Sequence, residues 1–260
     1  MNKNQQTLRI FGDSILKGVV YSEKEDRYVL LEDNGYTKLG NALGMEIQAN
    51  ALFGCTVTKG MQLLKRAIHR GIACDVVLLE YGGNDCDFLW DEVAAKPESN
   101  HFPNTPLTNF DETLRTMINM LKSISVIPLL MTLPPIDSDL FFAHICRNGL
   151  NKDNIRYWLK DIQNIGRHQE QYSAQIKKIA SETGTRLIDV RSEFEASQKT
   201  KYLLCKDGIH PNKQGHALIM QRLATEGARL LDERNLLDSV NLKDRMLPLP
   251  RYENTRSTEQ

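Results

Sequence analysis

Along most of this 260-residue chain, short apolar runs alternate with segments whose apolar residues recur with the period of an α-helix. The clearest run, residues 75–80, has four consecutive apolar side chains between two acidic ones, as is typical of a strand buried on both faces of a parallel sheet. Residues 111–124 instead carry apolar side chains three or four positions apart, which is the spacing of an amphipathic helix. Such alternation predicts an α/β fold, in which helices cover both faces of a parallel sheet.

The same pattern places the other elements. We expect five strands, over residues 7–11, 45–49, 75–80, 127–133 and 186–190. We expect helices over residues 36–43, 60–70, 111–124, 170–183 and 213–234, two of which are closed by Gly44 and Gly184. Functional groups of an open parallel sheet gather at the carboxyl ends of its strands, so motifs that follow these strands are candidates for one shared site.

The candidate motifs run from position 14 to 210, which favours a single domain over residues 1–240. Residues 136–168 form a long insertion with several aromatic side chains. Two interpretations stay open for it: a helical hairpin packed on the body, or a lid or pocket wall. Residues 241–260 read as a polar carboxyl-terminal tail laid along the surface.

Charge and composition exclude several classes of protein. Lys plus Arg and Asp plus Glu both count 33, so the formal net charge is zero and a nucleic-acid partner is not expected. No stretch approaches the length of an apolar membrane span. The amino terminus has no hydrophobic signal core, so we expect a cytoplasmic protein, with an extracellular location as the alternative. The five cysteines match no zinc or disulfide spacing, and we expect no metal ion and no cofactor.

A serine, a histidine and an aspartate stand where hydrolytic chemistry would need them. Ser14 follows the first expected strand, and Asp207 and His210 are three residues apart near the other end of the chain. A serine hydroxyl needs a base to take its proton, and that base needs an acceptor to fix its tautomer. His210 would be this base and Asp207 its acceptor. In isolation, each motif also fits an ordinary turn or helix cap.

Two further positions offer hydrogen-bond donors for a negatively charged oxygen. Gly54 lies in the loop after the second expected strand, where a backbone N–H is open to close approach. Asn84 follows the third expected strand and carries an amide that does not titrate. Each also fits a plain turn residue. Taken together in this order, they suggest an oxyanion hole for acyl transfer.

The ordered blocks Gly12-Asp13-Ser14, Gly54, Gly82-x-Asn84-Asp85 and Asp207-x-x-His210 resemble those of the SGNH (GDSL) hydrolase superfamily of esterase- and lipase-like acylhydrolases. Ile15 stands where that family usually has leucine. The resemblance implies a flavodoxin-like three-layer α/β/α fold with a five-stranded parallel sheet. It further implies that Ser14 is the nucleophile, His210 the base and Asp207 the orienting acid. The Ser14 N–H, the Gly54 N–H and the Asn84 side chain would form the oxyanion hole.

The activity expected from this resemblance is ester hydrolysis through an acyl-enzyme on Ser14. Short acyl or acetyl esters, carbohydrate esters among them, are the first substrate hypothesis. A lysophospholipase or thioesterase acting on longer acyl chains is the second, and a non-catalytic binding module that kept the pocket is the third. We assign Asp13, Asp85 and His144 as candidate substrate-binding residues. The expected partner is a small-molecule or carbohydrate ester, and self-association of the chain stays open.

Overall fold

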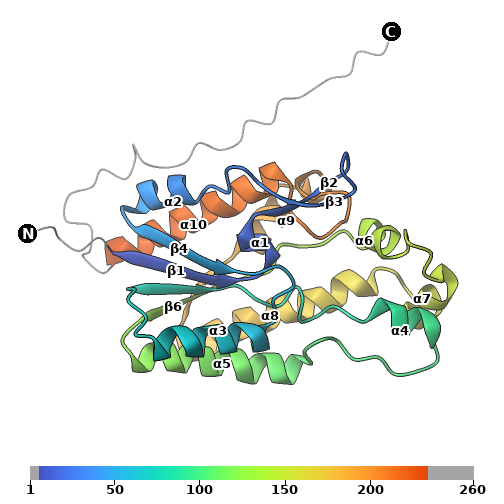
Figure 1. The fold of residues 1–260 in the computed structure, drawn as a ribbon, viewed down its shortest axis with the longest axis horizontal. Helices are drawn as coiled ribbons and strands as arrows, with labels where there is room; N and C mark the ends of the chain where they lie inside the picture. The colour runs from blue at the N-terminus through green and yellow to red at the C-terminus, as the bar shows by residue number, and fades with distance from the viewer. Residues whose placement is uncertain (1–5, 234–260) are drawn as a thin grey trace, which may run out of the picture.

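In a computed structural model of the protein, which describes residues 6–233, the core is one parallel sheet. Its five strands are β1 (Thr7–Gly12), β4 (Glu46–Ala51), β5 (Val76–Leu79), β6 (Ile127–Met131) and β7 (Arg186–Ile188), in the spatial order β4-β1-β5-β6-β7 (Figure 1). Counted along this sheet alone, the order is 2-1-3-4-5, that of flavodoxin-like folds. The predicted fold class is therefore confirmed.

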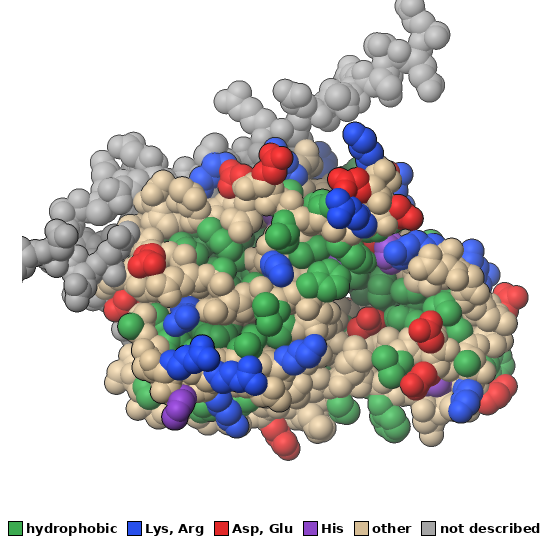
Figure 2. Space-filling view, viewed as in Figure 1, with side chains coloured by type: hydrophobic (Ala, Val, Ile, Leu, Met, Phe, Trp, Pro, Cys, Tyr) green, Lys and Arg blue, Asp and Glu red, His purple; other side chains and the backbone are tan. Residues whose placement is uncertain are grey.

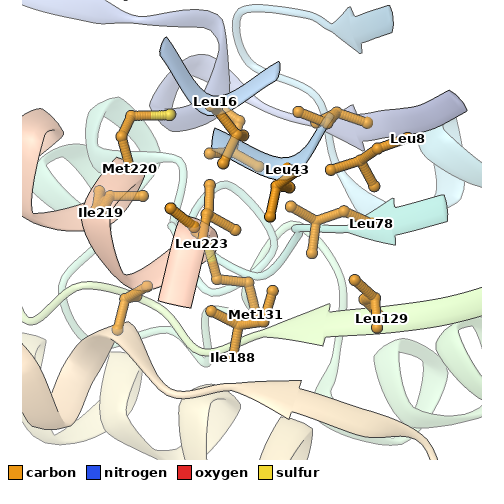
Figure 3. Close-up of a cluster of buried hydrophobic side chains, with 14 of the residues drawn as sticks. Leu8, Leu16, Leu43, Leu78, Leu129, Met131, Ile188, Ile219, Met220 and Leu223 are labelled. Carbon is orange, nitrogen blue, oxygen red and sulfur yellow. The ribbon is translucent and has the colours of Figure 1, made fainter. Parts of the chain in front are cut away.

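Helices cover both faces of the sheet because side chains alternate along its strands. Ile10 and Leu78 point to the face covered by α2 (Tyr36–Leu43), α9 (Val190–Ala196) and α10 (Lys213–Glu233). Figure 3 shows part of this cluster, where Leu78 and Met131 of the sheet lie near Leu223 of α10. Phe11 and Leu79 point to the opposite face, which packs against α3 (Val57–His69), α5 (Leu107–Ser123) and α8 (Asn164–Thr183).

The sheet strands and the long helices lie close to where the sequence predicts them, and several short elements outside the sheet were missed. A two-stranded antiparallel hairpin, β2 (Val19–Ser22) with β3 (Arg27–Leu30), is inserted between α1 (Ser14–Lys17) and α2. Its sequence signal is two four-residue β-prone runs separated by four charged residues, a pattern that fits a hairpin. The helix α4 (Trp90–Ala95), the 3-10 helix η1 (Thr200–Leu203) and α9 were also not predicted. Each is too short to show a period.

The insertion at residues 136–168 contains α6 (Ser138–Ile145), α7 (Lys152–Leu159) and the start of α8. These helices do not pair with one another as a helical hairpin. Instead α7 packs against α4 and α6 packs against α8, at the end of the molecule where the strands finish (Figure 1). Their apolar side chains form a third hydrophobic cluster, separate from the two that flank the sheet.

Two further expectations concern the carboxyl-terminal tail and membrane-spanning helices. The polar tail at residues 241–260, and with it the end of the domain near residue 240, lies outside the described residues. Within residues 6–233, no helix is both long and apolar enough to cross a membrane.

The core makes a first prediction. Leu78 of the central strand β5 is 0% exposed, and Leu78→Ala should lower the free energy of unfolding by about 2–5 kcal/mol, because it removes buried methyl groups and leaves a cavity. Leu30→Ala is the matched control, since Leu30 is 57% exposed and should change stability by less than about 0.5 kcal/mol. Urea unfolding of both variants measures the difference. Equal midpoints for the two would contradict this account of the core.

Candidate active site

Ser14 is held by the turn that links β1 to α1. Asp13 is the N-cap of this short helix, and its Oδ1 accepts a hydrogen bond of 2.8 Å from the Ile15 N–H. Ser14 is therefore the first helical residue, where backbone N–H groups lack partners within the helix and favour negative charge. The Ser14 side chain is almost completely buried, yet it is part of a cavity wall.

The structure brings Ser14, His210 and Asp207 together, although Ser14 and His210 are 196 positions apart. The Ser14 Oγ and His210 Nε2 are 2.9 Å apart, and the His210 Nδ1 lies 2.6 Å from the Asp207 Oδ2. The other Asp207 oxygen accepts from the backbone N–H groups of Ile209 and His210. This geometry allows the imidazole to take a proton from Ser14 while Asp207 fixes its tautomer.

Burial alone would raise the pKa of Asp207, but the hydrogen bond and charge of His210, together with the two backbone donors, hold that pKa below its ordinary value. Asp207 is 0% exposed and His210 4%. The carboxylate therefore stays ionised beside the imidazole across the neutral range. Ionisation suits a group that must stabilise an imidazolium ion.

Gly54 and Asn84 lie in the loops that follow β4 and β5. Gly54 adopts a positive φ of 66°, and the described part of the chain offers its N–H no acceptor. The Asn84 amide donates one hydrogen bond of 2.9 Å to the Asp13 Oδ2 and makes a longer contact of 3.4 Å with the Cys55 carbonyl oxygen. Asn84 borders the same cavity as Ser14, whereas Gly54 is not among the residues of its wall.

Two of the three expected substrate-binding residues are engaged inside the protein. Asp85 is fully buried, is not part of the cavity wall, and accepts the Val57 N–H with both carboxylate oxygens at 3.0 and 3.1 Å. It therefore anchors the start of α3, which corrects its expected role. Asp13 borders the cavity but is only 1% exposed, and its oxygens serve Ile15 and Asn84. Its structure fits a capping role rather than contact with substrate.

His144 does face the cavity, in a group of aromatic side chains that covers His210. Its Nε2 is 3.1 Å from the Tyr28 hydroxyl, and burial lowers the pKa of His144. The Tyr28 ring lies 4.9 Å from the His210 ring, and the Phe53 ring is nearly parallel to it at 6.2 Å. Tyr28 and Phe53 were missed in the sequence because the hairpin that carries Tyr28 was missed, and because Phe53 is a lone aromatic residue in a loop.

The cavity above Ser14 has a volume of about 840 Å³. Figure 2 shows hydrophobic side chains around a hollow on the side of the molecule where Figure 1 places α4, α6 and α7. The insertion supplies part of this wall and also packs against α4. The aromatic side chains of the wall are Tyr28, Phe53, Phe88, Trp90, Phe141 and Trp158.

Polar groups are also present in the cavity wall. Asp87 accepts a hydrogen bond of 2.8 Å from the Trp90 indole N–H, and burial raises the pKa of Asp87 to about 6. Asp91, Glu92 and Arg147 also contribute to the wall. Sequence reasoning did not single out Asp87, because an isolated acidic residue carries no pattern until the fold shows what it faces.

Comparisons with known proteins show the family of this chain. The model of the GDSL-like Lipase/Acylhydrolase family matches residues 10–218. The chain is 22% identical over 202 residues to GDSL esterase/lipase CPRD49 from Arabidopsis thaliana, a match that covers 76% of this chain and 71% of that protein.

Two solved structures share the fold. The lipase/acylhydrolase from Enterococcus faecalis superposes with a TM-score of 0.59 at 18% identity, covering 88% of this chain and 97% of that one. A catalytic mutant of Axe2, an acetylxylan esterase from Geobacillus stearothermophilus, superposes with a TM-score of 0.57 at 21% identity, covering 87% and 95% of the two chains. Because the family model spans most of the chain, from β1 into α10, the protein belongs to the GDSL-like lipase/acylhydrolase family and is a carboxylic ester hydrolase.

Proposed function

We propose that the protein hydrolyses esters through an acyl-enzyme on Ser14, with His210 as general base and Asp207 as the group that orients it. The observation that carries this proposal is the chain of hydrogen bonds from Ser14 Oγ through His210 to Asp207 at the edge of a cavity of about 840 Å³. Membership of an esterase family sets aside the hypothesis of a non-catalytic binding module.

In the first step, the Ser14 Oγ attacks the ester carbonyl carbon while its proton passes to the His210 Nε2. The carbonyl oxygen becomes negative and receives hydrogen bonds from the Ser14 N–H, the Gly54 N–H and the Asn84 amide. The alcohol then leaves with the proton from His210. A water molecule, deprotonated by the same imidazole, releases the acid and restores Ser14.

For the substrate, we propose a short acyl ester of a polyhydroxylated alcohol such as a sugar. The cavity combines aromatic rings, which pack on the apolar faces of sugar rings, with Asp87, whose carboxyl group can accept a hydroxyl hydrogen. The similarity of fold to an acetylxylan esterase is consistent with this choice. A second candidate is an ester with a longer acyl chain, which the volume and aromatic lining of the cavity favour.

Ser14→Ala should reduce ester hydrolysis by several orders of magnitude, because it removes the nucleophile. Turnover of an aryl acetate by the purified variant measures the loss. Ser123→Ala, which changes a serine exposed at the end of α5, is the control and should keep the parent rate. Hydrolysis by Ser14→Ala at the parent rate would refute the serine mechanism.

Asn84→Ala should lower kcat by roughly 10²–10³, as expected for the loss of one oxyanion donor. The effect on KM should be small, since the charge develops only in the transition state. Steady-state kinetics with the same aryl acetate give both constants. A kcat within a few-fold of the parent value would return Asn84 to a purely structural role in the turn.

The two substrate candidates differ in their response to Asp87→Asn. If Asp87 accepts a sugar hydroxyl, this variant should lose about tenfold in kcat/KM on an acetylated oligosaccharide, because a hydrogen bond to a charged group contributes about 1.5–3 kcal/mol. Its kcat/KM on the aryl acetate should not change. A series of aryl esters from two to sixteen carbons tests the other candidate, and a maximum at long chains would favour it.

A further inference from the structure

A buried carboxyl group lies directly behind the reacting serine. Glu80 follows β5 and is 0% exposed. Its Oε2 accepts the Asp13 N–H at 3.1 Å, and its Oε1 has no hydrogen-bond partner among the described residues. The Glu80 and Asp13 carboxyl groups lie close enough for each to shift the pKa of the other. Among the residues that the structure describes, neither of the two takes part in an ion pair with a lysine or arginine.

The glycine before Asp13 makes this approach possible. A Cβ atom at Gly12 would lie 2.8 Å from the Glu80 Oε2, closer than real Cβ contacts allow. The end of β1 therefore has room for the Glu80 carboxyl group only because position 12 has no side chain. The Gly-Asp-Ser turn and Glu80 form one packed unit.

Two neighbouring buried carboxyl groups resist being ionised together, so one of them keeps a proton. Burial raises the pKa of Asp13 too, but Asp13 is the better carboxylate, because its oxygens accept hydrogen bonds from the Ile15 N–H and the Asn84 amide. Burial and the Asp13 charge raise the pKa of Glu80 well above its ordinary value. Glu80 is then the member of the pair that keeps the proton.

We propose that Glu80 is a positioning residue for ester hydrolysis. Its neutral carboxyl group fixes the Asp13 turn, and through that turn both Ser14 and the Asn84 amide, while leaving a single negative charge beside the reacting atoms. This inference rests on the proposed function, in which Ser14 is acylated and Asn84 stabilises the oxyanion.

Neutrality of Glu80 matters because negative charge develops next to this pair during the reaction. A second carboxylate would repel the oxyanion and oppose its formation. The other titratable groups whose charges interact with the Glu80 carboxyl group stay neutral: burial raises the pKa of Cys55 to about 11 and raises the pKa values of Tyr36 and Tyr81 as well. Asp13 is thus the charged neighbour that decides the protonation state of Glu80. Asp85 and His210 interact electrostatically with Asp13.

The test compares two substitutions of Glu80. Gln imitates the protonated acid, because it can donate to Asp13 and accept the Asp13 N–H, so Glu80→Gln should keep kcat within about threefold of the parent. Glu80→Ala removes the support and should lower kcat by about tenfold or more with KM changed less, because the effect falls on the transition state. An equal loss of kcat in both variants, or an unchanged kcat in Glu80→Ala, would overturn the proposal.

A spectroscopic readout tests the same proposal without activity. In a protein labelled with ¹³C at the glutamate carboxyl carbons, the Glu80 resonance, assigned by its absence from Glu80→Gln, should stand at the protonated position at pH 7. Glu226 of α10 is the matched control, because it is also buried but pairs with Arg222 and Arg229. Glu226→Gln should leave both hydrolysis and the Glu80 resonance unchanged. An ionised Glu80 at pH 7 would overturn the proposal.

The Ser14→Ala variant separates this inference from the proposed function. If Ser14→Ala hydrolyses esters at the parent rate, the serine mechanism fails, and the Glu80 resonance still reports whether the acid pair shares one proton. If Ser14→Ala is inactive and Glu80 is ionised, the mechanism stands and the role of Glu80 fails.

Discussion

The parallel pairing of β1 with both of its neighbours is the constraint on which the site depends. Gly12 lies beside Ala51 of β4, and Phe11 lies beside Leu79 of β5. Two backbone hydrogen bonds extend this register past the strands, from the Leu52 N–H to the Gly12 oxygen and from the Glu80 N–H to the Phe11 oxygen. The loops with Ser14, Gly54 and Asn84 therefore leave the sheet side by side. This is the point where the strand order reverses, which is where open α/β sheets place their ligands.

The histidine reaches this point from a different part of the fold, and the insertion helps to hold it there. The loop from Asp207 to His210 is fixed by the Cys205 N–H, which donates to the His210 carbonyl oxygen, and by the Asp137 N–H, which donates to the Gly208 oxygen. Gly208 has a φ of 76°, and a Cβ atom there would lie 2.5 Å from the Phe141 nitrogen. Residues 136–168 thus border the cavity and also hold the loop that carries the histidine in place.

Three buried carboxyl groups near Ser14 behave differently because their partners differ. Asp207 pairs with His210 and two backbone donors, which together outweigh burial and hold its pKa below the ordinary value. Asp85 caps α3 through the Val57 N–H, and burial still raises its pKa to about 6. Glu80 faces another carboxyl group, and its most stable state is the neutral one. Residue type alone does not distinguish these cases, since the hydrogen-bond partner and the local charge set each protonation state.

Much of the fold and the reactive residues could be predicted from the sequence. The unbroken apolar run at residues 75–80 indicates a buried strand without any tertiary contact. Residues 111–124 are long enough for the spacing of their apolar side chains to indicate a helix. Short elements, such as the β2–β3 hairpin and α4, depend on the surfaces they pack against and were missed. The chemistry of Ser14, Asp207 and His210 and their order in the chain suggested the roles proposed for them, and the structure brings the three side chains together.

The sequence by itself determined the layered sheet and pointed to candidate residues for acyl transfer, because the spacing of apolar residues and the chemistry of turns are local properties of the chain. Only the tertiary structure decided which carboxyl groups face the cavity and which face each other. It moved Asp85 from a substrate contact to an anchor of α3, revealed Asp87 in the cavity wall, and placed Glu80 against Asp13. The physical reason is that burial, hydrogen-bond partners and neighbouring charge arise from residues far apart in sequence, which meet only when the sheet closes.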